Sequence, residues 1–275
     1  MKNLILSLLL IAVIVFASCE KDDDIVDITA PTITLEGPVN GETFPAGAAI
    51  LFDALFEDDI ELATFNLTIH ENFDGHGHGR IMVTPFAFDQ SFPLTGKSDD
   101  IHKEIAISAD ATAGPYHFIV EAIDNAGNST NFADDSSIEL EIWITNEEMP
   151  YVLFQDANEN EAVVYGGTVG DALEFYGEIG DEVGTLDHVE IMVGHLEESA
   201  EHDHARILEE AIYEGDFEVA GETSVRIEDL LANATITVSQ AHLDELEEGE
   251  HLHLIVVAED EAGNIASHSI EIHFD

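Results

Sequence analysis

One sequence pattern occurs near the end of each half of the chain, and this repeat constrains the fold more than any other feature. Residues 116–128 and 252–264 each read as an apolar strand followed by an Asp-x-Ala-Gly-Asn turn. Gly and Asn adopt positive φ at little cost, so each turn predicts a hairpin. A final alternating strand follows each turn, at residues 137–144 and 266–274. An internal repeat of this kind predicts two copies of one domain rather than a single large sheet.

The rest of the chain indicates an all-β protein. Beyond residue 18, short alternating runs are separated by Gly, Asn, Asp and Pro, and no stretch sustains a helical period. This pattern is typical of antiparallel β-sandwiches. The arrangement resembles bacterial immunoglobulin-like repeats, whose last hairpin commonly carries the same turn. The resemblance implies two tandem immunoglobulin-like antiparallel β-sandwiches, at residues 30–145 and 148–275.

The N-terminus has the pattern of a secretion signal. Lys2 is followed by an apolar run from Leu4 to Ala17, which is shorter than the ~20 residues of a spanning helix, so residues 1–18 are predicted to be removed. The run ends in Phe-Ala-Ser-Cys19, which resembles a bacterial lipobox. The resemblance implies cleavage before Cys19 and acylation of its thiol. Cys19 is the only cysteine in the chain, which excludes a disulfide framework and a four-cysteine zinc site.

Residues 19–29 form an acidic tether after this lipidated cysteine. The segment Glu20 to Asp24 resembles the short Lys-Asp-Asp export tag of Bacteroidota-type surface lipoproteins. The resemblance implies a lipid-anchored protein on the outer face of the outer membrane, where a receptor or transporter is a possible partner. The chain carries 59 acidic and 7 basic residues, a net charge of −52. Such a charge argues against binding to nucleic acid or to an anionic bilayer surface.

The histidines carry the chemistry that the sequence predicts. Three His-x-His pairs occur, where chance gives roughly 0.7, and two of them recur at equivalent places in the repeat, each followed by x-Arg. The candidate metal ligands are His70, His76, His78 and His117 in the first domain and His195, His202, His204 and His253 in the second. Clusters of imidazoles without thiolates suit Zn²⁺ best, with Cu²⁺ or Ni²⁺ as further possibilities. Arg80 and Arg206 are too cationic to ligate, and we expect each to pair with a carboxylate that orients a ligand.

Strand pairing gives this ligand set a spatial meaning. The third and sixth strands of an immunoglobulin-like sandwich pair antiparallel, so the end of one lies beside the start of the other. His70 ends the strand at residues 63–69, and His117 opens the strand at residues 118–123. Side-chain alternation predicts that both histidines face solvent. In the second domain the direct alignment places Gly194, rather than His195, at the position of His70, so the second site is the weaker prediction.

These features together resemble a Bacteroidota lipoprotein domain family of unknown function, built on an immunoglobulin-like fold. The resemblance rests on the lipobox, the His-x-His-x-Arg loops, the repeated turn and Tyr116-His117-Phe118, which becomes Leu252-His253-Leu254 in the second half. It implies a fold and a location but no reaction. The roles of His102, His242 and His251 stay open.

Two functions of different classes remain. The first is a surface-anchored metal-binding lipoprotein, with zinc favoured, and the second is a non-catalytic adhesive or scaffolding module. Ca²⁺ is a less favoured ion, which the acidic turns at residues 57–59 and 124–125 could bind through carboxylate oxygens. The sequence has no Ser-His-Asp or Gly-x-Ser-x-Gly arrangement and no bridging His and Asp set like that of copper–zinc superoxide dismutase, so we do not expect an enzyme.

Overall fold

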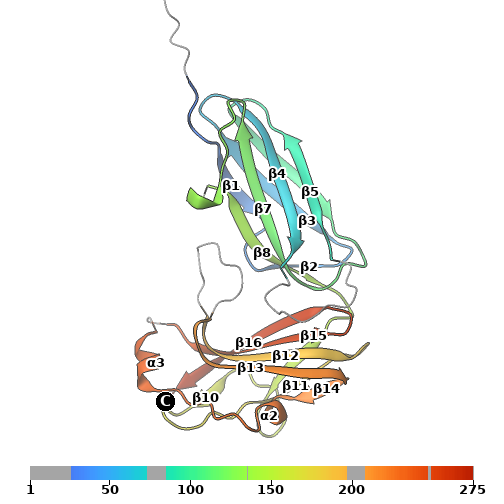
Figure 1. Cartoon of the computed structure of the whole chain (residues 1–275), viewed down its shortest axis with the longest axis vertical. Coiled ribbons are helices and arrows are strands. Elements are labelled where there is room, and N and C mark those ends of the chain that lie inside the picture. The colour runs from blue at the N-terminus through green and yellow to red at the C-terminus, as the bar shows by residue number, and fades with distance from the viewer. Residues whose placement is uncertain (1–25, 73–84, 135, 197–207, 247–248, 275) are drawn as a thin grey trace, which may run out of the picture.

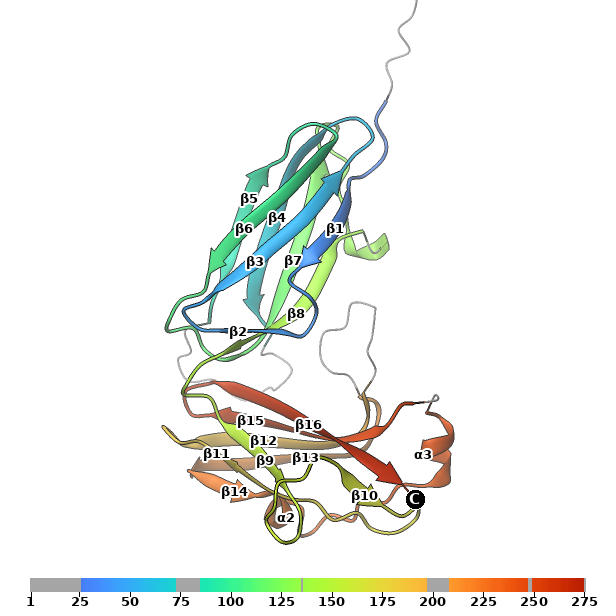
Figure 2. The ribbon, with the colours of Figure 1, turned by 180° about the vertical axis from the view of Figure 1, so that it is seen from behind.

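The computed structural model describes residues 26–72, 85–134, 136–196, 208–246 and 249–274, which form two all-β sandwiches (Figures 1 and 2). The first sandwich has a five-stranded sheet of order β2-β8-β7-β4-β5 and a three-stranded sheet of order β1-β3-β6. Its strands are β1 Thr32–Gly37, β2 Glu42–Pro45, β3 Ala49–Glu57, β4 Leu62–Glu71, β5 Phe88–Pro93, β6 Ser98–Ala106, β7 Gly114–Asp124 and β8 Ile138–Thr145.

The second sandwich repeats this topology strand for strand. Its larger sheet has the order β10-β16-β15-β12-β13, and its smaller sheet has the order β14-β11-β9. The strands are β9 Tyr151–Gln155, β10 Tyr165–Gly167, β11 Tyr176–Gly180, β12 Leu186–Leu196, β13 Leu208–Glu222, β14 Ser224–Arg226, β15 Leu252–Asp260 and β16 Ile265–Phe274. In both larger sheets a short edge strand, β2 or β10, pairs parallel to the last strand of the domain, and the other pairs are antiparallel. The predicted tandem sandwiches are thus confirmed.

Short helices lie between the strands, and the sequence pattern did not predict them. They are η1 Phe132–Asp134, α2 Ile227–Leu230 and α3 Gln240–Asp244. Each has at most five residues, too few for a hydrophobic period to appear. Ser239 caps α3 in a capping box that His242 completes, which gives one of the unassigned histidines a structural role.

The two cores differ in composition. The first is built on stacked aromatic rings, and Phe65 lies at their centre, with ring centroids 5.5 Å from Phe52, 4.8 Å from Phe56 and 5.0 Å from Phe92. The second core is mainly aliphatic, with Ile191, Val193 and Leu254 among its fully buried side chains. Each core therefore stabilises its own sandwich through apolar burial.

The predicted Asp-x-Ala-Gly-Asn turns form in both domains. In the first, Oδ1 of Asp124 accepts hydrogen bonds from the backbone of Gly127 and Asn128, and Oδ2 accepts one from the Asn128 side chain. Burial raises the pKa of Asp124, but these hydrogen bonds together outweigh it and lower that pKa overall. In the second domain, Asn264 bonds Asp260 through its backbone N–H and its side chain. Each Asp thus fixes the turn that follows it.

The second turn also joins the two domains. Oδ1 of Asn264 accepts hydrogen bonds from the backbone N–H of Ala113 (2.9 Å) and from the side chain of Asn146 (2.8 Å). The N–H of Ile265 donates to the carbonyl of Ala113 (2.9 Å), and the Ile265 side chain packs against the first core. The strands of the first domain run along the long axis of the molecule and those of the second run across it (Figure 1). Buried polar and apolar contacts therefore link the two domains at this joint.

Candidate functional site

His70 and His117 meet where strand pairing predicts. They are direct partners in the antiparallel ladder of β4 and β7. Their neighbours Ile69 and Phe118 are buried in the core, so alternation turns both histidines outward. The ring centroids lie 5.1 Å apart in an edge-to-face arrangement. The structure therefore brings together two of the four predicted ligands of the first domain.

Carboxylates and carbonyls surround this pair. Nδ1 of His70 lies 3.0 Å from the carbonyl oxygen of Glu71, and donation from Nδ1–H would leave Nε2 as the nitrogen that can bind a metal. Nδ1 of His117 lies 3.7 Å from Oε1 of Glu139. Glu141 is the direct partner of His117 in the β7–β8 ladder. The carbonyl of Glu71 could orient the His70 ring, and the carboxylate of Glu139 could orient the His117 ring, in a metal centre.

Seven of the predicted site residues lie outside the described part of the chain. They are Cys19, His76, His78, Arg80, His202, His204 and Arg206. The completion of either ligand set, and the pairing of either arginine with a carboxylate, therefore stay predictions.

The second domain does not repeat the histidine pair of the first. In the β12–β15 ladder, Gly194 is the partner of His253, and His195 is the partner of Leu252. No bulge between these two strands restores the phase at this end, so the two histidines are one position out of register. Nε2 of His195 instead lies 3.3 Å from Oε2 of Glu250. His195 and His253 are therefore not ladder partners as His70 and His117 are, and the prediction of an equivalent pair in the second domain is wrong in register.

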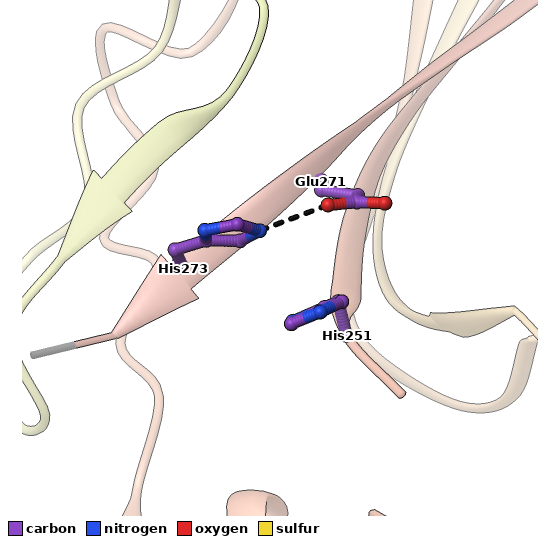
Figure 3. Close-up of side chains that lie close together, drawn as sticks. All are labelled: His251, Glu271 and His273. Atoms are coloured by element: carbon purple, nitrogen blue, oxygen red, sulfur yellow. Dashed lines mark hydrogen bonds and ion pairs between the residues drawn. The ribbon is translucent and has the colours of Figure 1, made fainter. Parts of the chain in front are cut away.

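A different cluster occupies this end of the second domain, formed by His251, Glu271 and His273 (Figure 3). The β15–β16 ladder pairs Leu252 with Ile272, so His251 and His273 continue it. Their rings stack with centroids 4.5 Å apart, and Nε2 of His273 lies 2.8 Å from Oε2 of Glu271. The three residues offer one ligand atom each, all within 4.8 Å of one another. Two imidazoles and a carboxylate are a ligand combination that proteins use for zinc.

The pKa values of Glu271 and of the neighbouring His253 are both lowered. The hydrogen bond from His273 lowers the pKa of Glu271, and the charges of the nearby histidines lower it further, which favours the carboxylate form. His253, the ladder partner of Glu271, has a pKa lowered by burial. Its imidazole is therefore neutral at neutral pH and can accept a metal or a proton.

Sequence reasoning missed the combination of these residues. The sequence pattern leaves the role of His251 open and does not predict Glu271 or His273 as ligands. The sequence nevertheless contains a signal. Glu271 and His273 are two positions apart on β16, so both side chains lie on the same face of the sheet, and β16 pairs with β15, which begins directly after His251.

His102 lies on β6 in the three-stranded sheet of the first domain and contacts two carboxylates. It is the ladder partner of Asp53, and its Nδ1 lies 2.6 Å from Oδ1 of that residue. Its Nε2 lies 3.4 Å from Oδ2 of Asp100. The hydrogen bond with Asp53 and the charge of Asp100 raise the pKa of His102. His102 therefore forms a surface ion pair with Asp53, on a different sheet from the other described candidate histidines.

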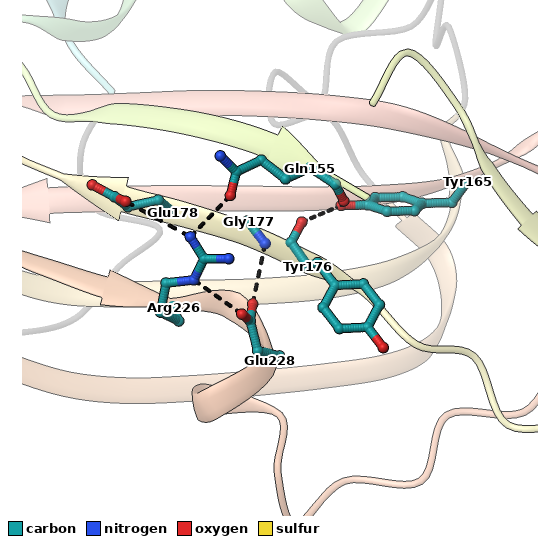
Figure 4. A network of polar contacts seen from close by, with 7 residues as sticks. All are labelled: Gln155, Tyr165, Tyr176, Gly177, Glu178, Arg226 and Glu228. Carbon is teal, nitrogen blue, oxygen red and sulfur yellow. Dashed lines mark hydrogen bonds and ion pairs between the residues drawn. The ribbon is translucent and has the colours of Figure 1, made fainter. Parts of the chain in front are cut away.

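The polar network around Arg226 is structural (Figure 4). Its guanidinium bonds Oε1 of Glu228 and Oε1 of Gln155, both at 2.9 Å, and lies 3.7 Å from Glu178. Burial opposes ionisation of Glu228, but its hydrogen bonds and the Arg226 charge lower its pKa overall. The Tyr165 hydroxyl donates to the nearby backbone carbonyls, and burial raises its pKa to about 12. These contacts tie α2 to the strands of the smaller sheet.

Comparison with known proteins gives a family match for the first half. Residues 17–142 match the model of a domain of unknown function (DUF4625). This agrees with the predicted resemblance to a family without an assigned activity, and the match does not extend over the second sandwich. No curated protein matches the chain. Among the described residues, no helix is long and apolar enough to cross a membrane.

Solved structures with similar folds are distant. They include fibronectin(III)-like modules of Clostridium thermocellum CbhA (14% identity, covering 89% of this chain and 94% of that one, TM-score 0.27). A tetra-tandem repeat from the extending region of a large adhesion protein has 13% identity, covers 88% of this chain and 48% of that one, and has a TM-score of 0.32. A chimeric titin Z1Z2 tandem has 12% identity, with the match covering 88% of this chain and 99% of that one, and has a TM-score of 0.31. The fold assignment of this chain rests on its own sheets.

Proposed function

We propose that the protein is a non-catalytic scaffolding or adhesive module that presents two immunoglobulin-like domains at a fixed relative orientation. The joint carries this proposal. Asn264 is only 3% exposed and bonds residues on both sides of the domain boundary, and Ile265 is 1% exposed against the first core. A flexible linker would need none of these contacts, whereas a scaffold that holds a binding surface at a set geometry does.

We further propose that this scaffold is displayed at the cell surface through acylated Cys19, with the acidic residues after it as a tether. Because one acylated residue would be the only anchor, Cys19→Ala should release the chain from the membrane fraction. Protease shaving of whole cells should remove the wild-type chain. Replacement of Lys21 to Asp24 by neutral residues should keep the chain in the membrane fraction but protect it from shaving. A Cys19→Ala chain that stays membrane-bound would contradict the anchor.

A second candidate function is transition-metal binding, with Zn²⁺ favoured and capture for an outer-membrane receptor as the context. Two observations support it: the His70–His117 pair in register, and the cluster of His251, Glu271 and His273. All of these residues except His251 lie on strands of a larger sheet, and His251 directly precedes β15, so the positions of their side chains are set mainly by ladders rather than by loops. Such preorganisation favours binding because less side-chain freedom is lost.

Calorimetric titration of Zn²⁺ separates the two functions. His251→Ala/His273→Ala should lose about one equivalent of bound metal, and His70→Ala/His117→Ala should lose another. His102→Ala is the matched control, because His102 is exposed and bound to a carboxylate, and it should leave the stoichiometry unchanged. A wild-type chain that binds no transition metal tighter than about 100 µM would remove this candidate and leave the scaffold.

A further inference from the structure

Asp58 and Asp181 occupy equivalent positions in the two domains. Each follows the central strand of a smaller sheet, β3 or β11. In each, Oδ1 accepts hydrogen bonds from the backbone N–H groups two and three residues ahead, at 2.9 and 2.7 Å for Asp58 and at 2.8 Å for both in Asp181. Both turns lie beside the Asp-x-Ala-Gly-Asn turn of the same domain, to which each is bonded through the backbone.

The second carboxylate oxygen sets these two residues apart. Oδ2 of Asp58 and Oδ2 of Asp181 are both buried, and neither has a hydrogen-bond partner among the described residues. Asp181 as a whole is only 6% exposed. Buried polar atoms are almost always paired, because the loss of water is otherwise uncompensated. The same unpaired oxygen at equivalent positions of two domains points to a shared ligand.

The surroundings of Asp181 are acidic. A hollow of about 300 Å³ is lined by Glu148, Asp181, Asp260 and Glu261. Asp260 is 3% exposed, and its pKa is raised by burial and further by the charge of Asp181. Neither of these two buried acids has a Lys or Arg partner within 4.0 Å in the part of the chain that the structure describes. Buried like charges without a counter-ion are costly, so a cation in this hollow would be stabilising.

The first domain carries a tighter acidic cluster at its N-terminal end, whereas no three of the four acids of the second domain offer ligand atoms within 4.8 Å of one another. Asp27, Asp58 and Asp59 offer ligand oxygens that all lie within 4.8 Å of one another. Partial burial raises the pKa of Asp27, and the charge of Asp124 is the next cause that raises it. Lys97 donates to the backbone carbonyl of Asp59, so this cluster has a partial counter-charge, which Asp181 and Asp260 do not have among the described residues.

We infer that each domain binds one Ca²⁺ ion at this end, between Glu148, Asp181, Asp260 and Glu261 in the second domain and between Asp27, Asp58 and Asp59 in the first. Clusters of carboxylate oxygens without nitrogen or sulfur ligands suit a hard cation, and several acidic side chains on turns suit the flexible coordination of Ca²⁺ better than the strict octahedron of Mg²⁺. In the second domain the ion would connect Glu148, which follows the first domain, to both turns of the second.

Calorimetric titration of Ca²⁺ into the chelator-treated full chain tests the inference. The wild-type chain should bind two equivalents, with Kd on the order of 10⁻⁴–10⁻³ M, as in extracellular modules. Asp181→Asn keeps the carbonyl oxygen that holds the turn but removes the charge, and it should weaken one equivalent by at least about tenfold. Asp58→Asn should do the same to the other. Asp156→Asn is the matched control, because Asp156 caps a similar turn with both of its oxygens hydrogen-bonded, and it should bind as the wild type does.

Thermal unfolding gives a second measurement that does not depend on stoichiometry. Ca²⁺ should raise the melting temperature of the wild-type chain, and Asp181→Asn should lose part of this rise. Without Ca²⁺, Asp181→Asn should melt at the same temperature as the wild type or higher, because it removes an uncompensated buried charge. A wild-type chain that binds no Ca²⁺ up to about 10 mM, an Asp181→Asn chain that binds as the wild type does, or one that melts lower in chelator would each overturn the inference.

Discussion

The side chain of Asn264 makes two hydrogen bonds that leave the second domain, and Asn264→Ala removes both. Its Oδ1 accepts from the backbone N–H of Ala113 and from the side chain of Asn146. Ala113 is fully buried, so its N–H would lose its partner without gaining water. Asn146 keeps its bond to the carbonyl of Ala111. The variant therefore leaves the buried N–H of Ala113, in the first domain, without a hydrogen-bond partner, although the altered residue lies in the second domain.

The magnitude follows from these contacts. A buried N–H left without a partner costs about 1–3 kcal/mol, and this cost falls on the first domain. Within the second domain, the lost bond from Asn264 to Oδ2 of Asp260 (2.8 Å) costs about 1.5–3 kcal/mol, because the acceptor is charged. We expect the first domain to lose about 1–3 kcal/mol of unfolding free energy through a residue that is not part of it.

Trp143 makes this measurement selective. It is the only tryptophan in the chain and lies on β8 of the first domain, so urea unfolding followed by its fluorescence reports that domain. Asn160→Ala is the matched control, since Asn160 bonds Asp156 in a similar turn of the second domain away from the joint. The control should leave the Trp143 transition in place, and Asn264→Ala should move it to lower urea. Equal transitions for the two variants would refute the reasoning.

Three further outcomes are expected. Phe65→Ala should cost about 3–5 kcal/mol, read from the Trp143 transition, because Phe65 is 1% exposed at the centre of the aromatic core; a loss under about 1 kcal/mol would mean that the core refills the space. Asp53→Asn should lower the pKa of His102, measured by NMR. Because that pKa is raised in the folded chain, the pair stabilises below the unfolded pKa and loses this effect as pH rises through the folded pKa, so the gap between wild type and variant should be larger at acidic pH. Zn²⁺ affinity at His251 and His273 should fall below about pH 6, because protons compete for imidazole, and calorimetry at pH 5 and 7.5 would show no difference if these rings are not ligands.

The pairing of His70 and His117 was predictable because it needs only the strand order of the fold and the alternation of side chains along two strands. A strand that ends in a histidine and a paired strand that begins with one must meet if the strand order is known. The failure in the second domain was visible for the same reason, since a one-residue offset changes the register and only a bulge could correct it. The structure shows no bulge there between β12 and β15.

The sequence offers the acidic turn at residues 57–59 of the first domain as a calcium candidate, but the acidic end of the second domain and the joint were not predictable at this level. The sequence contains 59 acidic residues, and nothing in it distinguishes Asp181 until burial and hydrogen-bond partners are known. The turn that ends in Asn264 was predicted, but its bond to Ala113 spans 151 positions and depends on how the two domains pack. Contacts between domains are set by surfaces that no local period describes.

The relative orientation of the two domains is the central claim, and residual dipolar couplings test it most directly. Backbone couplings measured separately for the described residues within 32–145 and within 151–274 of the wild-type chain should fit one alignment tensor with the domain arrangement seen here. The two sets should diverge in the Asn264→Ala chain. Two different tensors in the wild-type chain would show that the domains move independently, which would contradict a joint that holds a scaffold at fixed geometry.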